Sequence, residues 1–505
     1  MKRKVFIIAA LSLVFALSAA LLAGCSSVKE KSDFSVTPAS EEYREEVMSS
    51  SVAYEYLQWL SSDEMHSRYG SVDLDELSIN HGVGKAAFNI AAKMEEMGYE
   101  TFEDAYIDVD KEDGVLSASG EKKVTGLMRF ETSTGQAGVN VIYRKKATNG
   151  SRGQVILTAH FDNLFGRALS GGTVITAEGA YENGAAVATL LYVAQLLQEV
   201  ETQYDIVFAF LGSSVVTANN TIYYCWDGAK ALLSQLPELY GGEYEPVLNI
   251  NLHRLGGGEN LYMYSSDRPT SYNNYFYAAA EADGLDFSAP PAYKHAFSEA
   301  LSMQIMPSSP SGVYHPGLLT DSIHFINAGI PTLTYLSLDW ESGMETANHD
   351  SPDLAYTGRD TIENMNMGRG GEQAVKEQLN SVALNIITSV TGENAALFGQ
   401  AISTAKEELG GSGDAAYGLS VASMVLTWAL VIGLLVAAVI LRGKNVTKMT
   451  MRRRPAPSSP QADPFAEFNK SGDPFEEFGS DKNEGRGGKN DQNKPSGGDD
   501  IFEGF

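Results

Sequence analysis

The sequence predicts an α/β domain between about residues 45 and 408. Short apolar runs that indicate buried strands alternate there with helical patterns, and glycine-rich turns separate the two. The predicted strands cover 139–143, 154–158, 204–211, 247–252 and 331–336, and the predicted helices cover 184–200 and 371–389.

Each predicted element follows from its residue pattern. The strand segments are short and rich in valine, isoleucine, leucine and aromatic residues, as buried strands are. The segment 184–200 is too long for a strand and apolar on nearly all sides, which indicates a buried helix. The segment 371–389 is amphipathic and predicts a helix that closes the domain.

The 505-residue chain allows one large domain with appendages, or two domains. Its formal net charge of −27 argues against a nucleic-acid partner, which would need a basic face to displace counterions. The two cysteines, Cys25 and Cys225, provide no disulfide framework.

The N-terminal segment 1–25 is predicted to be a lipoprotein-type signal peptide. Basic residues at 2–4 precede an apolar run at 5–22, and the small residues before Cys25 resemble a bacterial lipobox. Cys25 would then carry the lipid, and 26–44 would form a polar tether. The alternative is an uncleaved signal anchor in which the cysteine is coincidental.

A transmembrane helix is predicted at 416–442. Residues 419–441 are almost wholly apolar, and about 20 such residues suffice to span the hydrocarbon core. Basic residues follow directly, so the positive-inside rule places the C-terminal tail in the cytoplasm and the main domain outside. We expect the cell membrane of a bacterium with a single membrane, because a spanning helix fits poorly in an outer membrane.

The tail 443–505 is predicted to be cytoplasmic and disordered, since its composition cannot bury enough apolar surface to fold. A motif with two phenylalanines three residues apart and acidic flanks recurs at 463–468, 473–478 and 500–505. Exposed aromatic residues often anchor a partner, and three copies would add avidity. We therefore expect a cytoplasmic protein partner. The alternative is chance recurrence in a low-complexity tail.

Candidate site residues lie at the ends of the predicted strands. His160 and Asp162 follow the second strand, where open α/β sheets place their ligands. Glu182 opens the long apolar helix, and His253 ends the next strand. His349 follows much later in the chain. Each residue alone has an ordinary explanation: an H-x-D pair occurs on surfaces, and a glutamate favours the positive end of a helix.

Together these blocks resemble metallopeptidase family twenty-eight, the co-catalytic zinc aminopeptidases. The resemblance covers roughly residues 45–395 and includes the D-x-x-F motif that begins at Asp321 and the later Gly329-Ile330-Pro331. It implies a three-layer α/β/α domain with a central mixed sheet. It also implies that peptides or proteins are the ligands outside the cell.

The resemblance assigns roles residue by residue. His160 and His349 stand at the histidine ligands of the first and second zinc, and Asp162 at the acid that orients His160. Glu182 stands where an aspartate would bridge both ions, and His253 replaces an aspartate ligand. The glutamates expected after the strand 204–211 are replaced: Ser213 stands at the general base and Ser214 at a ligand of the second zinc.

These replacements predict at most one zinc ion. Two histidines and one carboxylate (His160, Glu182 and His253) suit a single zinc with an open water position. The second site keeps only Glu182 and His349, so a two-metal mechanism is not expected.

Two functions remain open on the sequence. The first is a catalytically impaired domain without a bound metal that serves binding or scaffolding outside the cell. The second is a divergent mono-zinc aminopeptidase or amide hydrolase, as glutaminyl cyclases of the same fold use one zinc.

Overall fold

The computed structural model describes residues 34–69, 77–110, 114–117, 122–148, 153–163, 178–218, 221–224, 226–258, 260–265, 271–288, 320–338, 354 and 358–404. All of them belong to the first of two compact units, Met1–Gly418. The predicted signal peptide with Cys25, the predicted membrane span at 416–442, the tail with its three motifs, and His349 lie outside the described residues. Within the described ranges, no helix has both the length and the apolarity to cross a membrane.

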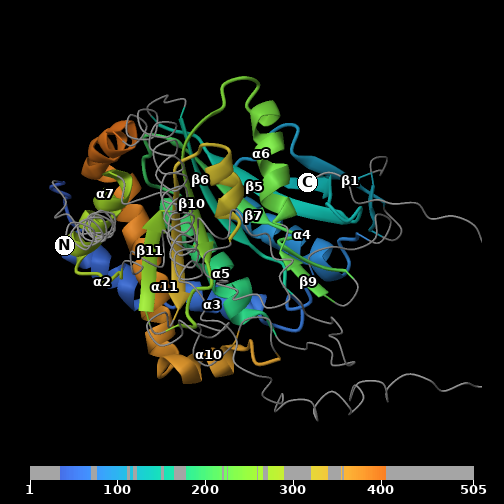
Figure 1. Ribbon diagram of the computed structural model, residues 1–505, viewed down its shortest axis with the longest axis horizontal. Helices are drawn as coiled ribbons and strands as arrows, with labels where there is room; N and C mark the ends of the chain where they lie inside the picture. The colour runs from blue at the N-terminus through green and yellow to red at the C-terminus, as the bar shows by residue number, and fades with distance from the viewer. Residues whose placement is uncertain are drawn as a thin grey trace, which may run out of the picture. The chain divides into compact units, whose positions relative to one another are not determined.

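A seven-stranded mixed sheet forms the centre of the domain, in the order β11-β12-β10-β6-β7-β5-β4 (Figure 1). The central strands β12, β10, β6 and β7 run parallel, whereas β11 pairs antiparallel at one edge and β5 and β4 at the other. The strands are β4 (Leu127–Glu131), β5 (Ala137–Lys145), β6 (Gly153–His160), β7 (Asp205–Leu211), β10 (Glu245–His253), β11 (Asn260–Ser265) and β12 (Thr332–Leu338).

Helices lie before, between and after the strands of this sheet along the chain. They are α2 (Glu41–Ser49), α3 (Val52–Leu60), α4 (Gly82–Glu96), α5 (Ala185–Leu197), α6 (Asp227–Leu239), α7 (Ser271–Asp283), α9 (Ser322–Asn327), α10 (Ile362–Arg369) and α11 (Glu372–Val390), with a π-helical turn η1 (Ala180–Gly184) and a 3-10 turn η2 (Gly392–Asn394). Helices α2 (blue) and α11 (orange) lie side by side although they are far apart in the sequence (Figure 1). The Asn380 side chain joins them by donating to the carbonyls of Met48 and Ser50.

Alternate side chains of the sheet contribute to two separate cores, one on each face. Phe208 and Phe210 of β7 pack in the core that contains α5 and α11. Ala209 and Leu211 of the same strand pack in the core that contains α6. Because successive side chains of a strand point to opposite faces, this division places helices on both sides of the sheet. The three-layer arrangement with a central mixed sheet is confirmed.

The predicted elements are confirmed with small shifts at their ends. The segment predicted as a helix over 184–200 forms α5, and 371–389 forms α11. Helix α5 is buried on nearly all sides between the sheet, α3 and α11, which explains its apolar composition.

Two smaller sheets complete the described structure. Strands β2 (Leu116–Ser117), β1 (Tyr106–Val109) and β3 (Lys122–Thr125) form one of them. Strands β8 (Val215–Ala218) and β9 (Thr221–Tyr224) form an antiparallel hairpin that starts directly after Ser214. The serine pair therefore connects a central strand to this hairpin.

The parallel strands bring the candidate residues to one edge of the sheet. β6 ends at His160 and its parallel neighbour β10 ends at His253. β7, on the other side of β6, ends two residues before Ser213. The carboxyl ends of parallel strands are where open α/β sheets bind their ligands.

Candidate metal centre at the carboxyl edge of the sheet

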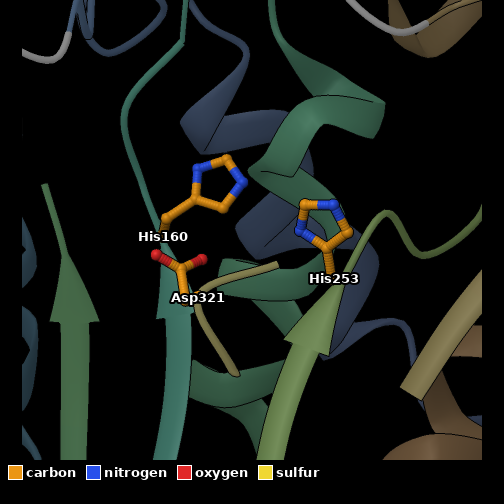
Figure 2. A group of neighbouring side chains, drawn as sticks. All are labelled: His160, His253 and Asp321. Atoms are coloured by element: carbon orange, nitrogen blue, oxygen red, sulfur yellow. The ribbon is translucent and has the colours of Figure 1, made fainter. Parts of the chain in front are cut away.

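Three buried side chains can hold a metal ion at this edge (Figure 2). His160 comes from the end of β6, His253 from the end of β10, and Asp321 immediately precedes α9. One ligand atom of each lies within 4.8 Å of the others. The two imidazole rings are 5.3 Å apart between their centroids.

Several polar atoms of these side chains are available to bind a cation. Both ring nitrogens of His253 and the Oδ2 atom of Asp321 are buried without a hydrogen-bond partner. Unpartnered polar atoms in a protein interior are costly, and a metal ion would satisfy them. Burial also holds the pKa of His253 well below its ordinary value, so the ring is in the neutral form that binds metals. Two imidazole nitrogens and one carboxylate oxygen form a donor set that suits zinc.

Glu182 is engaged by charged partners. Its Oε1 atom lies 2.9 Å from Nε2 of His160. Its Oε2 atom accepts a hydrogen bond from Nε of Arg254, and both members of this pair are almost fully buried. Burial alone would raise the pKa of Glu182, but Arg254 and the two histidines lower it well below its ordinary value. The carboxylate is therefore ionised and already paired with a permanent cation.

Asn183 and Asp360 hold the backbone around Glu182. The Asn183 side-chain amide donates to the carbonyls of His160 (3.2 Å) and Leu252 (3.3 Å), so it joins the ends of β6 and β10. The Asp360 carboxylate accepts the backbone N–H groups of Tyr181 (2.6 Å) and Glu182 (3.0 Å). Residues distant in sequence thus fix the turn that carries Glu182.

Asp162 connects His160 to the loop after β7. Its Oδ1 atom lies 3.4 Å from Nδ1 of His160, and its Oδ2 atom accepts the backbone N–H of Ser214 at 3.0 Å. Burial alone would lower the pKa of His160, but Asp162 and Glu182 raise it well above its ordinary value. Metal binding at this ring would therefore release a proton.

The two serines have different surroundings. Ser214 donates its hydroxyl hydrogen to Oδ1 of Asp321 at 2.8 Å, so it positions that carboxylate. Burial raises the pKa of Asp321 to about 6, although His160 and the Ser214 hydrogen bond oppose the shift. Ser213 has a left-handed backbone with φ of 56°. Its Oγ atom lies close to Gly138 of β5, where an added Cβ would come within 2.5 Å of it.

The structure thus brings most of the predicted site residues together, whereas His349 lies outside the described part of the chain. His160, Asp162, Glu182, Ser214 and His253 lie in one buried cluster. The sequence reasoning assigned no role to Asp321 or Arg254. Signals for both were present: Asp321 begins the D-x-x-F motif, and Arg254 directly follows His253.

The described residues thus form an α/β domain with a buried cluster of histidine and carboxylate side chains, a candidate metal centre, at the carboxyl edge of its mixed sheet. Residues 140–375 match the family described as Peptidase family M28. This match confirms, for these residues, the resemblance to the family that the sequence motifs predicted.

Solved structures with a similar arrangement include aminopeptidases and glutaminyl cyclases. A structure of BSAP, a zinc aminopeptidase from Bacillus subtilis, matches with 20% identity over 52% of this chain and 52% of that chain, with a TM-score of 0.36. This chain thus spans about half of that structure. A leucine aminopeptidase precursor from Bacteroides thetaiotaomicron matches with 14% identity over 68% and 97% of the two chains, with a TM-score of 0.42. A glutaminyl cyclase from Fimbriiglobus ruber matches with 14% identity over 71% of this chain and 98% of that chain, with a TM-score of 0.43. No curated protein matches the chain.

Proposed function

We propose that this M28 domain has lost two-metal peptide hydrolysis and acts as a binding or scaffolding domain outside the cell. The observation that carries this proposal is the buried pair between Glu182 and Arg254. Glu182 stands where a carboxylate would bridge two metal ions, and a guanidinium neutralises it instead.

The serine pair supports the same proposal. A serine at position 213 cannot accept a proton from water near neutral pH, and loss of a general base typically costs ~10²–10⁴ in rate. Ser214 offers a neutral oxygen where the resemblance places a metal-binding carboxylate, and it is hydrogen-bonded to Asp321. Two-metal catalysis requires both the attacking and the leaving oxygen to be stabilised by cations.

The proposal extends to the membrane and the tail. The signal sequence with Cys25, the apolar segment 416–442 and the basic residues after it support anchoring in a bacterial cell membrane. The motifs at 463–468, 473–478 and 500–505 support a cytoplasmic partner. A peptide or protein bound outside would then be connected to that partner through the membrane.

A second candidate function is a mono-zinc aminopeptidase or amide hydrolase. The unpartnered nitrogens of His253 and Oδ2 of Asp321, close to His160, favour it. A zinc ion held by these three residues would supply Lewis-acid activation of water or of a carbonyl group. Asp162 would orient the His160 ring, and Ser214 would position Asp321.

Metal content and hydrolysis of the purified full-length chain distinguish the two functions. Zinc is quantified by mass spectrometry, and cleavage of aminoacyl-anilide and amide substrates is measured with and without a chelator. His160→Ala and His253→Ala are compared with His81→Ala, an exposed histidine outside the centre. Under our proposal neither the natural chain nor any variant hydrolyses these substrates. Hydrolysis that the chelator and His160→Ala abolish, while His81→Ala does not, would refute it in favour of the second function.

A further inference from the structure

The position of Arg254 is fixed at the carboxyl end of β10. It is the first residue after β10, and its backbone is left-handed with φ of 45°. Its N–H donates to Oδ1 of Asn183 at 2.7 Å, and its carbonyl accepts the N–H of Ser337 at 3.0 Å. The side chain is 1% exposed. The backbone is thus held from two sides, and the guanidinium lies in the interior against Glu182.

The guanidinium is a permanent charge at this position. An arginine does not deprotonate in proteins, whereas a histidine or lysine could release its proton when a metal ion arrives. Removing the guanidinium charge from Glu182 would require the side chain to move away. A second divalent ion at Glu182 would therefore face an unscreened positive charge in a site of low dielectric constant.

The buried charges of the centre leave room for one divalent cation. Around the centre, four of the buried carboxylates of the described residues accompany two buried guanidiniums: Asp162, Glu182, Asp321 and Asp360 with Arg68 and Arg254. With all four carboxylates ionised the formal excess is two negative charges, which one divalent ion balances, and the excess is smaller where Asp360, whose pKa burial raises to about 7, is protonated. Two divalent ions would leave an excess of two positive charges in the interior, which is unfavourable.

We propose that Arg254 is a resident cation that replaces a metal ion at Glu182, and that it limits the centre to one divalent ion on His160, His253 and Asp321. This inference rests on the proposed loss of the two-metal site. It attributes the limit of one divalent ion to Arg254, a residue to which the family resemblance assigns no role, and not to the two serines alone.

The test measures zinc binding, not activity, on the full-length chain. Stoichiometry comes from native mass spectrometry, and affinity from competition with a chelating dye. Three variants are compared with the natural chain: Arg254→Met, Glu182→Gln, and both changes together. The double variant removes both charges of the pair, so it keeps the net charge of the natural centre. Replacing a buried ion pair by neutral groups of similar volume is often tolerated, so this variant is expected to fold.

Arg254→Met should bind zinc at least ~10-fold more tightly than the natural chain, because one positive charge a few Å from the ion has been removed. Glu182→Gln should bind at least ~10-fold more weakly, since Arg254 is then uncompensated. The double variant should return to within ~3-fold of the natural affinity, because net charge governs binding.

Two results would overturn the inference. One is equal zinc affinity in the natural chain and Arg254→Met. The other is a double variant as weak as Glu182→Gln, which would make Glu182 itself a zinc ligand; this comparison decides the matter even if Arg254→Met does not fold. Chelator-sensitive hydrolysis by the natural chain would contradict the proposed function while leaving these affinity differences intact, so the two failures are distinguishable.

Discussion

Asn183 should be one of the most sensitive positions for the stability of the centre. It is fully buried, and its side chain makes three hydrogen bonds: to the carbonyls of His160 and Leu252, and from the N–H of Arg254. A typical internal hydrogen bond contributes ~1 kcal/mol, and an orphaned buried partner costs more. Asn183→Ala should therefore lower the free energy of unfolding by ~3 kcal/mol.

Asn183→Asp tests whether the hydrogen-bonding pattern or only the shape matters. An aspartate can still accept the N–H of Arg254, but its second oxygen would face the two carbonyl oxygens. We expect a loss at least as large as for alanine, because the ionised group repels both carbonyls.

The measurement is urea unfolding of the full-length chain followed by circular dichroism, with a lower midpoint and an unchanged m-value. Asn364→Ala is the matched control, since its amide donates to the carbonyl of Arg359 at an exposed position. It should change stability by no more than ~0.5 kcal/mol. If Asn183→Ala is as mild as this control, Asn183 does not hold the two strand ends together.

Two further predictions concern the frame of the site. Burial raises the pKa of Asp360 from its ordinary 3.8 to about 7, because the folded state favours the protonated carboxyl group. The stability that this preference contributes is fully present below pH ~4 and is lost as the pH rises to ~7. Asp360→Asn should flatten the pH dependence of the unfolding free energy in that window by ~2–4 kcal/mol; an unchanged slope would show that Asp360 titrates normally. A Cβ on Gly228 would lie 2.2 Å from the carbonyl oxygen of Gly212, so Gly228→Ala should destabilise the domain by ~1–3 kcal/mol. Gly358→Ala is the control and should not destabilise the domain, because a Cβ added there meets no atom within 4 Å. Equal thermal midpoints for the two variants would contradict the close packing of α6.

The fold could be predicted from local patterns because strands that are buried on both faces of the sheet have continuous apolar runs in the sequence. β6 carries a central apolar run and β7 is apolar after its first residue, as central parallel strands are, and α5 is apolar on nearly all sides. The hairpin of β8 and β9 was not predicted. A signal for it was present, because two asparagines, Asn219 and Asn220, separate two segments rich in β-branched and aromatic residues.

The candidate site could be predicted only in part. His160 and His253 were found because each ends a recognisable strand, and parallel neighbours bring such ends together. Asp321 was missed as a candidate ligand because it precedes a short helix, and its distance from the histidines depends on how α9 packs on the sheet.

The sequence by itself determined the alternation of strands and helices, the match to the family, and the two serines, Ser213 and Ser214, at positions where the resemblance expects glutamates. These are properties of residue types and their spacing along the chain. Only the tertiary structure decided that Arg254 pairs with Glu182 and that Asp321 joins the two histidines. The physical reason is that charge balance in a buried site depends on which side chains meet in space. An arginine next to a histidine in sequence can point to solvent or into the interior, and that choice depends on the packing of the surrounding strands and loops.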